Sequence, residues 1–216
     1  MANFQAKMFN KKASDPKNKP DQIIEAIALK LGQSVADIGS GGGYFSLRFA
    51  KIVGEDGRVY AVDTKPEFLE YVKNSAKEKG LNNIPTLVSG DKLDLPEKSL
   101  DLIFMRNVTH IPNRVEYFKN LKRFLKPSGR IAIIKYKKGK TFTFRGLFGH
   151  YVHKETIVQE MEKTGYLLEK ESNFLPEQHF TIYVAENEIK NNHNYNTCNV
   201  LLSLLRLFWC NKKEVI

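Results

Sequence analysis

The chain has 216 residues, 42% of them hydrophobic and 27% charged, with a formal net charge of +10 at pH 7. This length fits a single domain with a full hydrophobic core, and the composition excludes an intrinsically disordered chain. No apolar run approaches the roughly 20 residues that span a bilayer, so we expect no transmembrane span. The two cysteines, Cys198 and Cys210, both lie near the C-terminus and predict neither a disulfide framework nor a zinc site.

The positive charge comes mostly from lysine and gathers in two clusters, one before residue 20 and one over residues 135–140. Such clusters predict an anionic partner, such as RNA, an acidic lipid or a phosphorylated metabolite. A lysine-rich solvated surface is the plainer interpretation, which the acids interleaved along most helices favour. The N-terminus has no apolar leader, and together with the cysteine usage this predicts a cytoplasmic protein.

The first part of the chain predicts, in order, a flexible basic segment, a helix, a strand, a helix, a strand and a helix. Pro20 and Pro66 suit the first turn of a helix, and Gly32 and Gly80 suit the end of one. Apolar residues at helical or continuous spacing mark the elements between these points. The predicted elements occupy residues 1–19, 20–31, 35–38, 44–52, 58–63 and 66–80.

The second part of the chain alternates in the same way. We expect strands at 86–89, 102–105 and 131–134, helices at 115–125 and 154–164, and a closing pair of strands at 166–174 and 179–184. Residues 91–99 predict a loop or a single turn, and residues 137–152 predict a mobile segment over the pocket. The alternation predicts an α/β fold with a doubly wound, mostly parallel sheet and right-handed crossovers.

The most informative stretch is residues 35–45, in which a strand meets three alternate glycines and then a helix. Glycine allows backbone angles that side chains forbid and lets a ligand lie against the main chain. A helix N-terminus at this point presents unpaired N–H groups and a partial positive charge. The spacing of Gly39, Gly41 and Gly43 differs from the Gly-x-Gly-x-x-Gly of dinucleotide-binding turns, because the longer motif needs glycine where Tyr44 stands.

Two acids near this turn indicate which ligand it holds. Asp63 lies twenty residues beyond Gly43, a distance at which a carboxylate accepts hydrogen bonds from ribose hydroxyls. Asp37 would repel a pyrophosphate but attract an ammonium group. S-adenosylmethionine fits both, so the sequence predicts this cofactor at the carboxyl edge of a parallel sheet. A turn role alone for Gly41 and Gly43, and a helix N-cap role for Asp63 before Pro66, remain as alternatives.

Five blocks in consistent order resemble a known family, the class I S-adenosylmethionine-dependent methyltransferases. The blocks are Val35 to Gly43, Val59 to Asp63, Ser89-Gly90-Asp91, Leu100 to Asn107, and Leu125-Lys126-Pro127-Ser128-Gly129. The resemblance covers about residues 20–185. It is nearest to the ubiquinone/menaquinone-biosynthesis C-methyltransferases and the arsenite-methyltransferase-like group. It implies a Rossmann-like, three-layer α/β/α fold with seven strands, of which the seventh is antiparallel.

The resemblance implies a role for each block. Asp37 and the glycine turn would hold the methionine end, Asp63 the ribose, and Asp91 the adenine, with a plain turn role as the alternative for Asp91. Residues leaving the fourth strand would face the sulfonium. The implied cofactor-binding residues are Asp37, Gly39, Ser40, Gly41, Gly43, Tyr44, Asp63, Thr64, Gly90, Asp91, Lys92, Asn107 and Val108.

An acceptor such as a phenol or an acidic carbon needs a base to remove its proton. His110, just past the fourth strand, is the best-placed candidate, and His150 and Tyr136 are weaker ones. We expect no metal site, because no acid cluster resembles the magnesium site of catechol O-methyltransferases. The thiols of the arsenite enzymes are also missing, since both cysteines lie in the tail.

We therefore expect an S-adenosylmethionine-dependent methyltransferase domain at residues 20–185 that acts on a small-molecule acceptor. An RNA or protein methyltransferase that uses the basic surface is one alternative, and a catalytically idle cofactor-binding domain is another. Residues 186–216 predict an asparagine-rich linker and a short apolar helix at 200–210. This helix is expected to pack on its own domain, to bury against a partner or a second copy in a homodimer, or to lie in a membrane interface.

Overall fold

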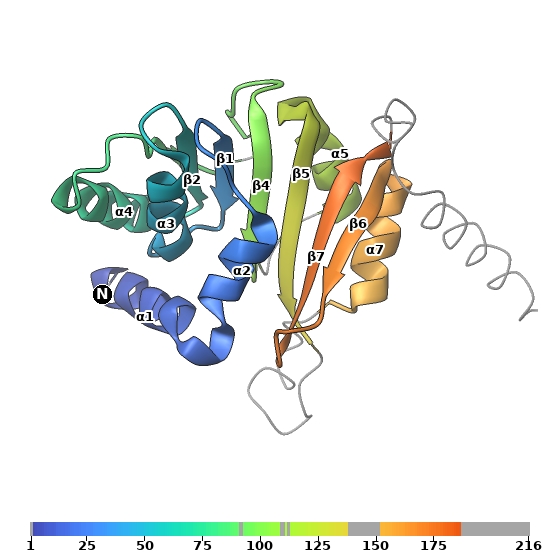
Figure 1. Cartoon of the computed structure of the whole chain (residues 1–216), viewed down its shortest axis with the longest axis horizontal. Helices are drawn as coiled ribbons and strands as arrows, with labels where there is room; N and C mark the ends of the chain where they lie inside the picture. Colours follow the sequence, from blue (N-terminus) through green and yellow to red (C-terminus); the bar gives the residue numbers. More distant parts are fainter. Residues whose placement is uncertain (1, 91–92, 109–110, 112, 138–151, 187–216) are drawn as a thin grey trace, which may run out of the picture. The chain divides into compact units, whose positions relative to one another are not determined.

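A computed structural model of the chain describes residues 2–90, 93–108, 111, 113–137 and 152–186 (Figure 1). The chain divides into two units, residues 1–185 and residues 186–216, and the fold below belongs to the first. The predicted apolar helix at 200–210 and nearly all of the predicted linker lie outside the described residues. So does the segment 138–151, which the sequence predicts over the pocket.

A seven-stranded sheet in the order β3-β2-β1-β4-β5-β7-β6 forms the centre of this unit (Figure 1). The first five of these strands are parallel, and β7 runs antiparallel to both β5 and β6. The predicted mostly parallel sheet with an antiparallel closing strand is therefore confirmed. The strands are β1 (Ser34–Ile38), β2 (Arg58–Asp63), β3 (Thr86–Val88), β4 (Leu100–Arg106), β5 (Leu125–Tyr136), β6 (Tyr166–Ser172) and β7 (Gln178–Ala185).

Helices cover both faces of the sheet, which gives the predicted three layers (Figure 1). Successive strand residues point to opposite faces. In β4, Phe104 therefore packs on the side of α1 to α4, whereas Met105 packs on the side of α5 and α7. Burial on both faces explains the continuous apolar runs of the central strands. The helices are α1 (Ala2–Ser14), η1 (Pro16–Asn18), α2 (Pro20–Ile27), α3 (Tyr44–Val53), α4 (Pro66–Glu78), α5 (Arg114–Leu121), η2 (Lys122–Phe124) and α7 (Lys154–Lys163).

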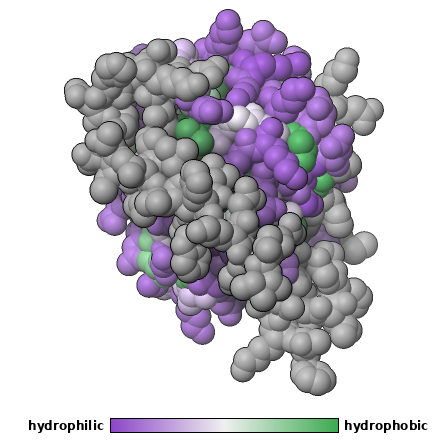
Figure 2. All heavy atoms as spheres, turned by 90° about the vertical axis from the view of Figure 1, so that its right-hand side faces the viewer, coloured by the Kyte–Doolittle hydropathy of each residue, from purple (hydrophilic) through white to green (hydrophobic). Residues whose placement is uncertain are grey.

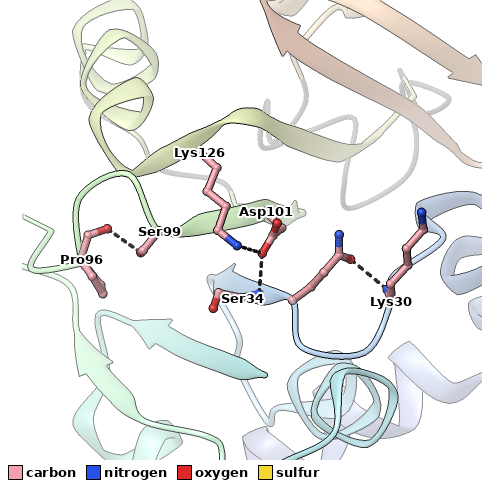
Figure 3. Close-up of polar contacts among 7 residues, drawn as sticks. Lys30, Ser34, Pro96, Ser99, Asp101 and Lys126 are labelled. Atoms are coloured by element: carbon pink, nitrogen blue, oxygen red, sulfur yellow. Dashed lines mark hydrogen bonds and ion pairs between the residues drawn. The ribbon is translucent and has the colours of Figure 1, made fainter. Parts of the chain in front are cut away.

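One carboxylate ties together the amino ends of the central strands (Figure 3). Asp101 Oδ2 accepts hydrogen bonds from the Ser34 backbone N–H at 2.8 Å and from Lys126 Nζ at 2.7 Å. These contacts join the start of β1 to β4 and β5. Because ligands of parallel sheets bind at the carboxyl ends, this cluster supports the fold rather than a binding site.

The N-terminal segment differs from the expectation of a loosely ordered chain. Residues 2–14 form helix α1, which packs against α3 and α4. Its inner face buries Ala6 and Ala13, and Asn10 bonds the glycine turn. Alanines give no long apolar stripe in the sequence, so contacts with the rest of the domain specify where this helix lies.

Helix α2 is shorter than predicted. It ends at Ile27, because Ala28 takes a left-handed conformation and donates its N–H to the Ile24 carbonyl oxygen. Leu31 therefore falls outside the helix and is 80% exposed instead of lying on its apolar stripe.

Strand β5 begins earlier than predicted, at Leu125. The block of the family resemblance at residues 125–129 lies within the strand as an irregularity, since Leu125 pairs with Leu100 while Arg130 pairs with Leu102.

Within the described residues, no helix is both long and apolar enough to cross a bilayer. Figure 2 shows the end of the sheet that carries β6 and α7, where the described side chains are mostly hydrophilic. Lys154 and Glu171 form an ion pair there, with 2.9 Å between Nζ and Oε1.

Candidate functional site

A cavity of about 1340 Å³ opens at the carboxyl ends of β1, β2 and β4. The strand order places β2 and β4 on opposite sides of β1, so this edge contains the switch point at which parallel sheets bind ligands. The glycine turn between β1 and α3 forms one wall of the cavity, and residues of α1 and α5 form others.

The glycine turn needs its glycines for two different reasons. Gly39, Gly41 and Gly43 all have positive φ angles, of 75°, 54° and 76°. A Cβ atom would also lie 2.8 Å from Val108 Cγ2 at Gly39, and 2.6 Å from Val72 Cγ2 at Gly43. At Gly41 it would meet only Phe9, at 3.4 Å. Gly41 therefore leaves space beside the main chain where a ligand can lie.

Gly42 is glycine because of α1. Its φ is not among the positive ones, but a Cβ atom there would overlap the Ala6 carbonyl oxygen and the Asn10 side chain. Asn10 Nδ2 donates to the Gly42 carbonyl oxygen at 2.8 Å, and Asn10 Oδ1 accepts from the Tyr44 backbone N–H at 3.1 Å. Asn10 of α1 thus provides hydrogen-bond partners for two backbone groups where the turn enters α3, the Gly42 carbonyl oxygen and the Tyr44 N–H. The first N–H groups of a helix have no partner within the helix and need one from elsewhere.

Asp63, the last residue of β2, holds the turn from the other side. Its Oδ2 accepts from the Gly41 backbone N–H at 2.9 Å, and its Oδ1 accepts from the Lys65 backbone N–H at 3.1 Å. A carboxylate has about four acceptor positions, so capacity remains for ribose hydroxyls. Lys65 is the N-cap of α4. The alternative role of Asp63 as that N-cap is therefore wrong.

Asp37 lies beneath the turn and is only 3% exposed. Ser46 Oγ donates to Asp37 Oδ2 at 2.5 Å. Burial raises the pKa of Asp37 to about 6, although the Ser46 hydrogen bond acts in the opposite direction. The nearby Asp63 charge also raises this pKa, and Arg106 lowers it. A cationic ligand would favour the ionised form.

Arg106, at the end of β4, is a site residue that the sequence analysis did not single out. Its guanidinium lies over the Phe45 ring at 5.3 Å and makes one long hydrogen bond, from Nη2 to Gln178 Oε1 at 3.4 Å. Its Nε is buried without a hydrogen-bond partner among the described residues. Burial lowers the pKa of Arg106, while Tyr136, Asp37 and Tyr44 raise it. The arginine is thus a cavity-lining cation with an unused donor.

Ser40 has a similar unused group. Its Oγ is buried without a hydrogen-bond partner among the described residues, and the residue lines the cavity. Its backbone N–H already donates to the Val62 carbonyl oxygen at 3.0 Å. Buried polar atoms are almost always paired in folded proteins. An unpaired hydroxyl in a cavity wall is therefore suited to a polar ligand.

The chain leaving β4 is fixed by its neighbours. Asn107 has a positive φ of 56°, and its Oδ1 accepts from Gln178 Nε2 at 2.8 Å. The Val108 carbonyl oxygen accepts a hydrogen bond from Lys135 Nζ. Burial lowers the pKa of Lys135 to about 8. These contacts hold Asn107 and Val108 in place in the part of the cavity wall that lies next to Gly39.

The remaining predicted residues divide into two groups. Tyr44, Thr64 and Gly90 line the cavity, together with Asp37, Asp63, Asn107 and Val108. Asp91, Lys92 and His110 lie outside the described residues, so their predicted roles stay predictions. In the part of the chain that the structure describes, no group of three or more histidine, cysteine, aspartate or glutamate side chains could hold a metal ion.

The α1 residues Phe9, Asn10, Lys12 and Ala13 also line the cavity. Their place in the cavity wall differs from the expectation of a flexible segment at the N-terminus. The signal that could have found them is the spacing of Ala6, Asn10 and Ala13, which places small and polar side chains on one helix face.

Comparisons with known proteins agree with this geometry. Residues 29–197 match a family model described as "Methyltransferase domain". The ubiquinone/menaquinone biosynthesis C-methyltransferase UbiE of Pseudomonas paraeruginosa is 30% identical over 121 residues, which are 53% of this chain and 46% of that protein. UbiE of Shewanella frigidimarina is 26% identical over 156 residues, or 69% of this chain and 59% of that protein. The chain spans about half the length of the curated relatives it matches.

Among solved structures, a SAM-dependent methyltransferase from Aquifex aeolicus is similar. It has a TM-score of 0.72 and 27% identity, and the match covers 82% of this chain and 96% of that one. The likeness therefore extends over nearly the whole of that enzyme.

Proposed function

Because the chain is a class I S-adenosylmethionine-dependent methyltransferase, we propose that it methylates a small-molecule acceptor in the cavity described above. It belongs to the family described as "Methyltransferase domain", and UbiE is among its relatives in sequence. S-adenosylmethionine is its cofactor.

One observation carries the assignment of the site: opposite charges line the cavity together. Asp37 and Arg106 influence each other's pKa, and both line the cavity beside the glycine turn. The amino-acid part of S-adenosylmethionine carries an ammonium and a carboxylate. We assign the ammonium to Asp37 and the carboxylate to Arg106, because each charge then meets its opposite in a partly buried place.

The groups without partners fit the same cofactor. Ser40 Oγ and Arg106 Nε are buried donors without partners in the described residues. Gly41 presents bare main chain to the cavity with only Phe9 close by, and Asp63 keeps acceptor capacity after its two backbone bonds. We assign Asp63 to the ribose hydroxyls. A dinucleotide fits less well, because its pyrophosphate would meet the Asp37 carboxyl.

Bound S-adenosylmethionine supplies a methyl group on a positively charged sulfur that a nucleophile can displace. The residues of the chain align the two reactants and keep water away. Asn107 and Val108 position the wall beside this part of the site, and Phe104, Phe45 and Phe9 add apolar lining. His110 stays the candidate for proton removal from the acceptor.

The small-molecule acceptor is supported by two facts. The relatives are named as methyltransferases of ubiquinone and menaquinone biosynthesis. The cavity, at about 1340 Å³, also exceeds the roughly 300–1000 Å³ of typical ligand pockets, which leaves room for an acceptor beside the cofactor. RNA or protein methylation is not favoured, and retention of Asp37, Asp63 and the glycines argues against an idle domain. The cytoplasmic location stays a prediction.

The test uses the full chain with S-adenosylmethionine that carries a labelled methyl group, together with fractionated cell extract. Label should pass to a small organic molecule, and calorimetry should show binding of S-adenosylmethionine and of its demethylated product. Transfer to RNA or protein alone would contradict the small-molecule proposal. Failure to bind either form of the cofactor would contradict the site assignment as well.

A further inference from the structure

Helix α1 has two faces that differ in what they contact. Ala6, Asn10 and Ala13 share the inner face, where they meet the glycine turn and the core. Phe4 and Met8, four residues apart, share the outer face. The helix is therefore held to the domain by one side and leaves the other to its surroundings.

The outer face exposes large apolar side chains. Phe4 is 73% exposed and Met8 is 48% exposed. Of the six large hydrophobic residues that are exposed in the described part of the chain, these two lie on the outer face of this one helix, while Phe9, a third on α1, lines the cavity instead. Single exposed apolar residues are ordinary, but a concentration on one helix indicates a contact surface.

Positive charge surrounds these apolar side chains. Lys7 and Lys11 follow Phe4 and Met8 by three residues each, so they lie next to them on the helix surface. Lys12 belongs to the other side of the helix, since it lines the cavity and its Nζ lies 5.2 Å from the centre of the Tyr136 ring. Helix α1 contains no aspartate or glutamate. A basic helix with an exposed apolar face is typical of segments that lie on membrane surfaces.

Other occupants suit this face less well. A second copy would bring the same positive charge, and the chain's own apolar segment at 200–210 is followed by Lys212 and Lys213, with no acid between residues 189 and 213. RNA would pair with the lysines but would leave the exposed Met8 without a role. An anionic lipid surface takes the cations at its headgroups and the apolar side chains just below them.

We propose that the outer face of α1, formed by Phe4, Lys7, Met8 and Lys11, docks the protein on an anionic lipid surface. The inner face of the helix lines the cavity through Phe9 and Asn10. Docking therefore brings the cavity wall to within one helix diameter of the lipid, about 10 Å. An acceptor dissolved in the membrane would meet the site there, but the docking itself does not depend on methyl transfer.

The test is sedimentation of the full chain with vesicles. One set is phosphatidylcholine alone, and the other contains about 30% phosphatidylglycerol, which carries the negative charge. The protein should sediment with the anionic vesicles and stay in solution with the neutral ones, and added salt should release it. Equal sedimentation with both, or none with either, would overturn the proposal.

Matched variants assign the contact to α1. Lys7→Gln with Lys11→Gln should weaken binding about thirtyfold, since each lysine near an anionic surface contributes about a five- to sixfold step. Phe4→Ser with Met8→Ser should also weaken it. Leu31→Ser and the pair Lys163→Gln, Lys170→Gln make the same changes elsewhere on exposed residues and should bind like the original protein. Equal losses in the control variants would refute a specific role for α1.

A conservative variant, Phe4→Trp, gives a second test that does not depend on whether the serine variants fold. Phe4→Trp places an indole on the outer face, in addition to Trp209. Brominated acyl chains in anionic vesicles should quench the emission that this variant adds to that of the original protein. If the added emission is not quenched while the protein sediments, α1 does not touch the lipid.

Discussion

Asp63 accepts a hydrogen bond from the backbone N–H of Gly41 at 2.9 Å, so the end of β2 holds the glycine turn that follows β1. The residue that we assign to the ribose thus also fixes the turn that passes along the cofactor. Loss of this one carboxylate would therefore affect both the ribose contact and the position of the glycine turn.

The first prediction concerns this carboxylate. Asp63→Ala should weaken binding of S-adenosylmethionine about ten- to a hundredfold, because it removes hydrogen bonds to a charged acceptor and frees the turn. Asp63→Asn keeps an oxygen for the Gly41 N–H and should lose less affinity. Calorimetry measures both. Asp56→Ala changes an exposed acid before the same strand and serves as the control. Unchanged affinity in Asp63→Ala would refute its assignment to the ribose.

The second prediction separates backbone strain from obstruction. Gly41→Val should abolish cofactor binding, because the side chain would project into the cavity beside Phe9, where the ligand would lie. Gly80→Val serves as its control, since Gly80 has a comparable φ of 66° and nothing within 4 Å of an added Cβ atom. Both variants should lose about 1–3 kcal/mol of unfolding free energy through a strained positive φ. Thermal unfolding and calorimetry together would show whether only Gly41→Val loses the cofactor.

The third prediction is a pH dependence. Burial raises the pKa of Asp37 to about 6, and an ammonium group binds the ionised carboxylate. Affinity for S-adenosylmethionine should therefore fall by about tenfold for each pH unit below 6. In Asp37→Asn the affinity should be lower near pH 7 and should lose this slope. A slope that persists in the variant would show that another group titrates.

The same carboxyl has the opposite effect on the stability of the cofactor-free protein. The pKa of Asp37 in the folded protein, about 6, lies above its ordinary value of 3.8. Its contribution to stability is therefore fully present below pH 3.8 and is lost as pH rises through about 6. Asp37→Asn should therefore gain unfolding free energy relative to the original protein as pH rises from 4 to about 7. Denaturant titrations of the cofactor-free protein at several pH values would measure this.

The fourth prediction tests the assignment of Arg106 to the cofactor's carboxylate. Arg106→Gln should weaken S-adenosylmethionine binding about ten- to a hundredfold. Decarboxylated S-adenosylmethionine supplies the matched ligand. The original protein should bind it more weakly than the complete cofactor, while Arg106→Gln should bind the two about equally. If the variant still prefers the complete cofactor by the original ratio, another group holds the carboxylate.

The sequence predicted the parts of this fold that local chemistry determines. Strand β2 has the predicted bounds, Arg58–Asp63, because an apolar run ends at a turn on each side. Asp37 and Asp63 were predicted to line one site, and both line the cavity. Glycines at fixed spacing and acids at strand ends follow from rules of parallel sheets, so they can be read from one chain.

The features that the sequence did not predict depend on distant contacts. Helix α1 is specified by Asn10 meeting Gly42 and Tyr44, which lie more than thirty residues away. Arg106 matters because β4 places it over Phe45, a residue of α3. Neither partner is visible in the local pattern, so the sequence indicated a flexible basic segment at the N-terminus and did not single out Arg106.

Gly42 and the first helix constrain one another. Since the backbone at position 42 would itself accept an ordinary side chain, only the nearness of Ala6 and Asn10 excludes one. A homologue with alanine or serine at this place would have to carry its leading segment elsewhere. A side chain at that single position is therefore incompatible with a cofactor turn that is covered by the helix in the same way.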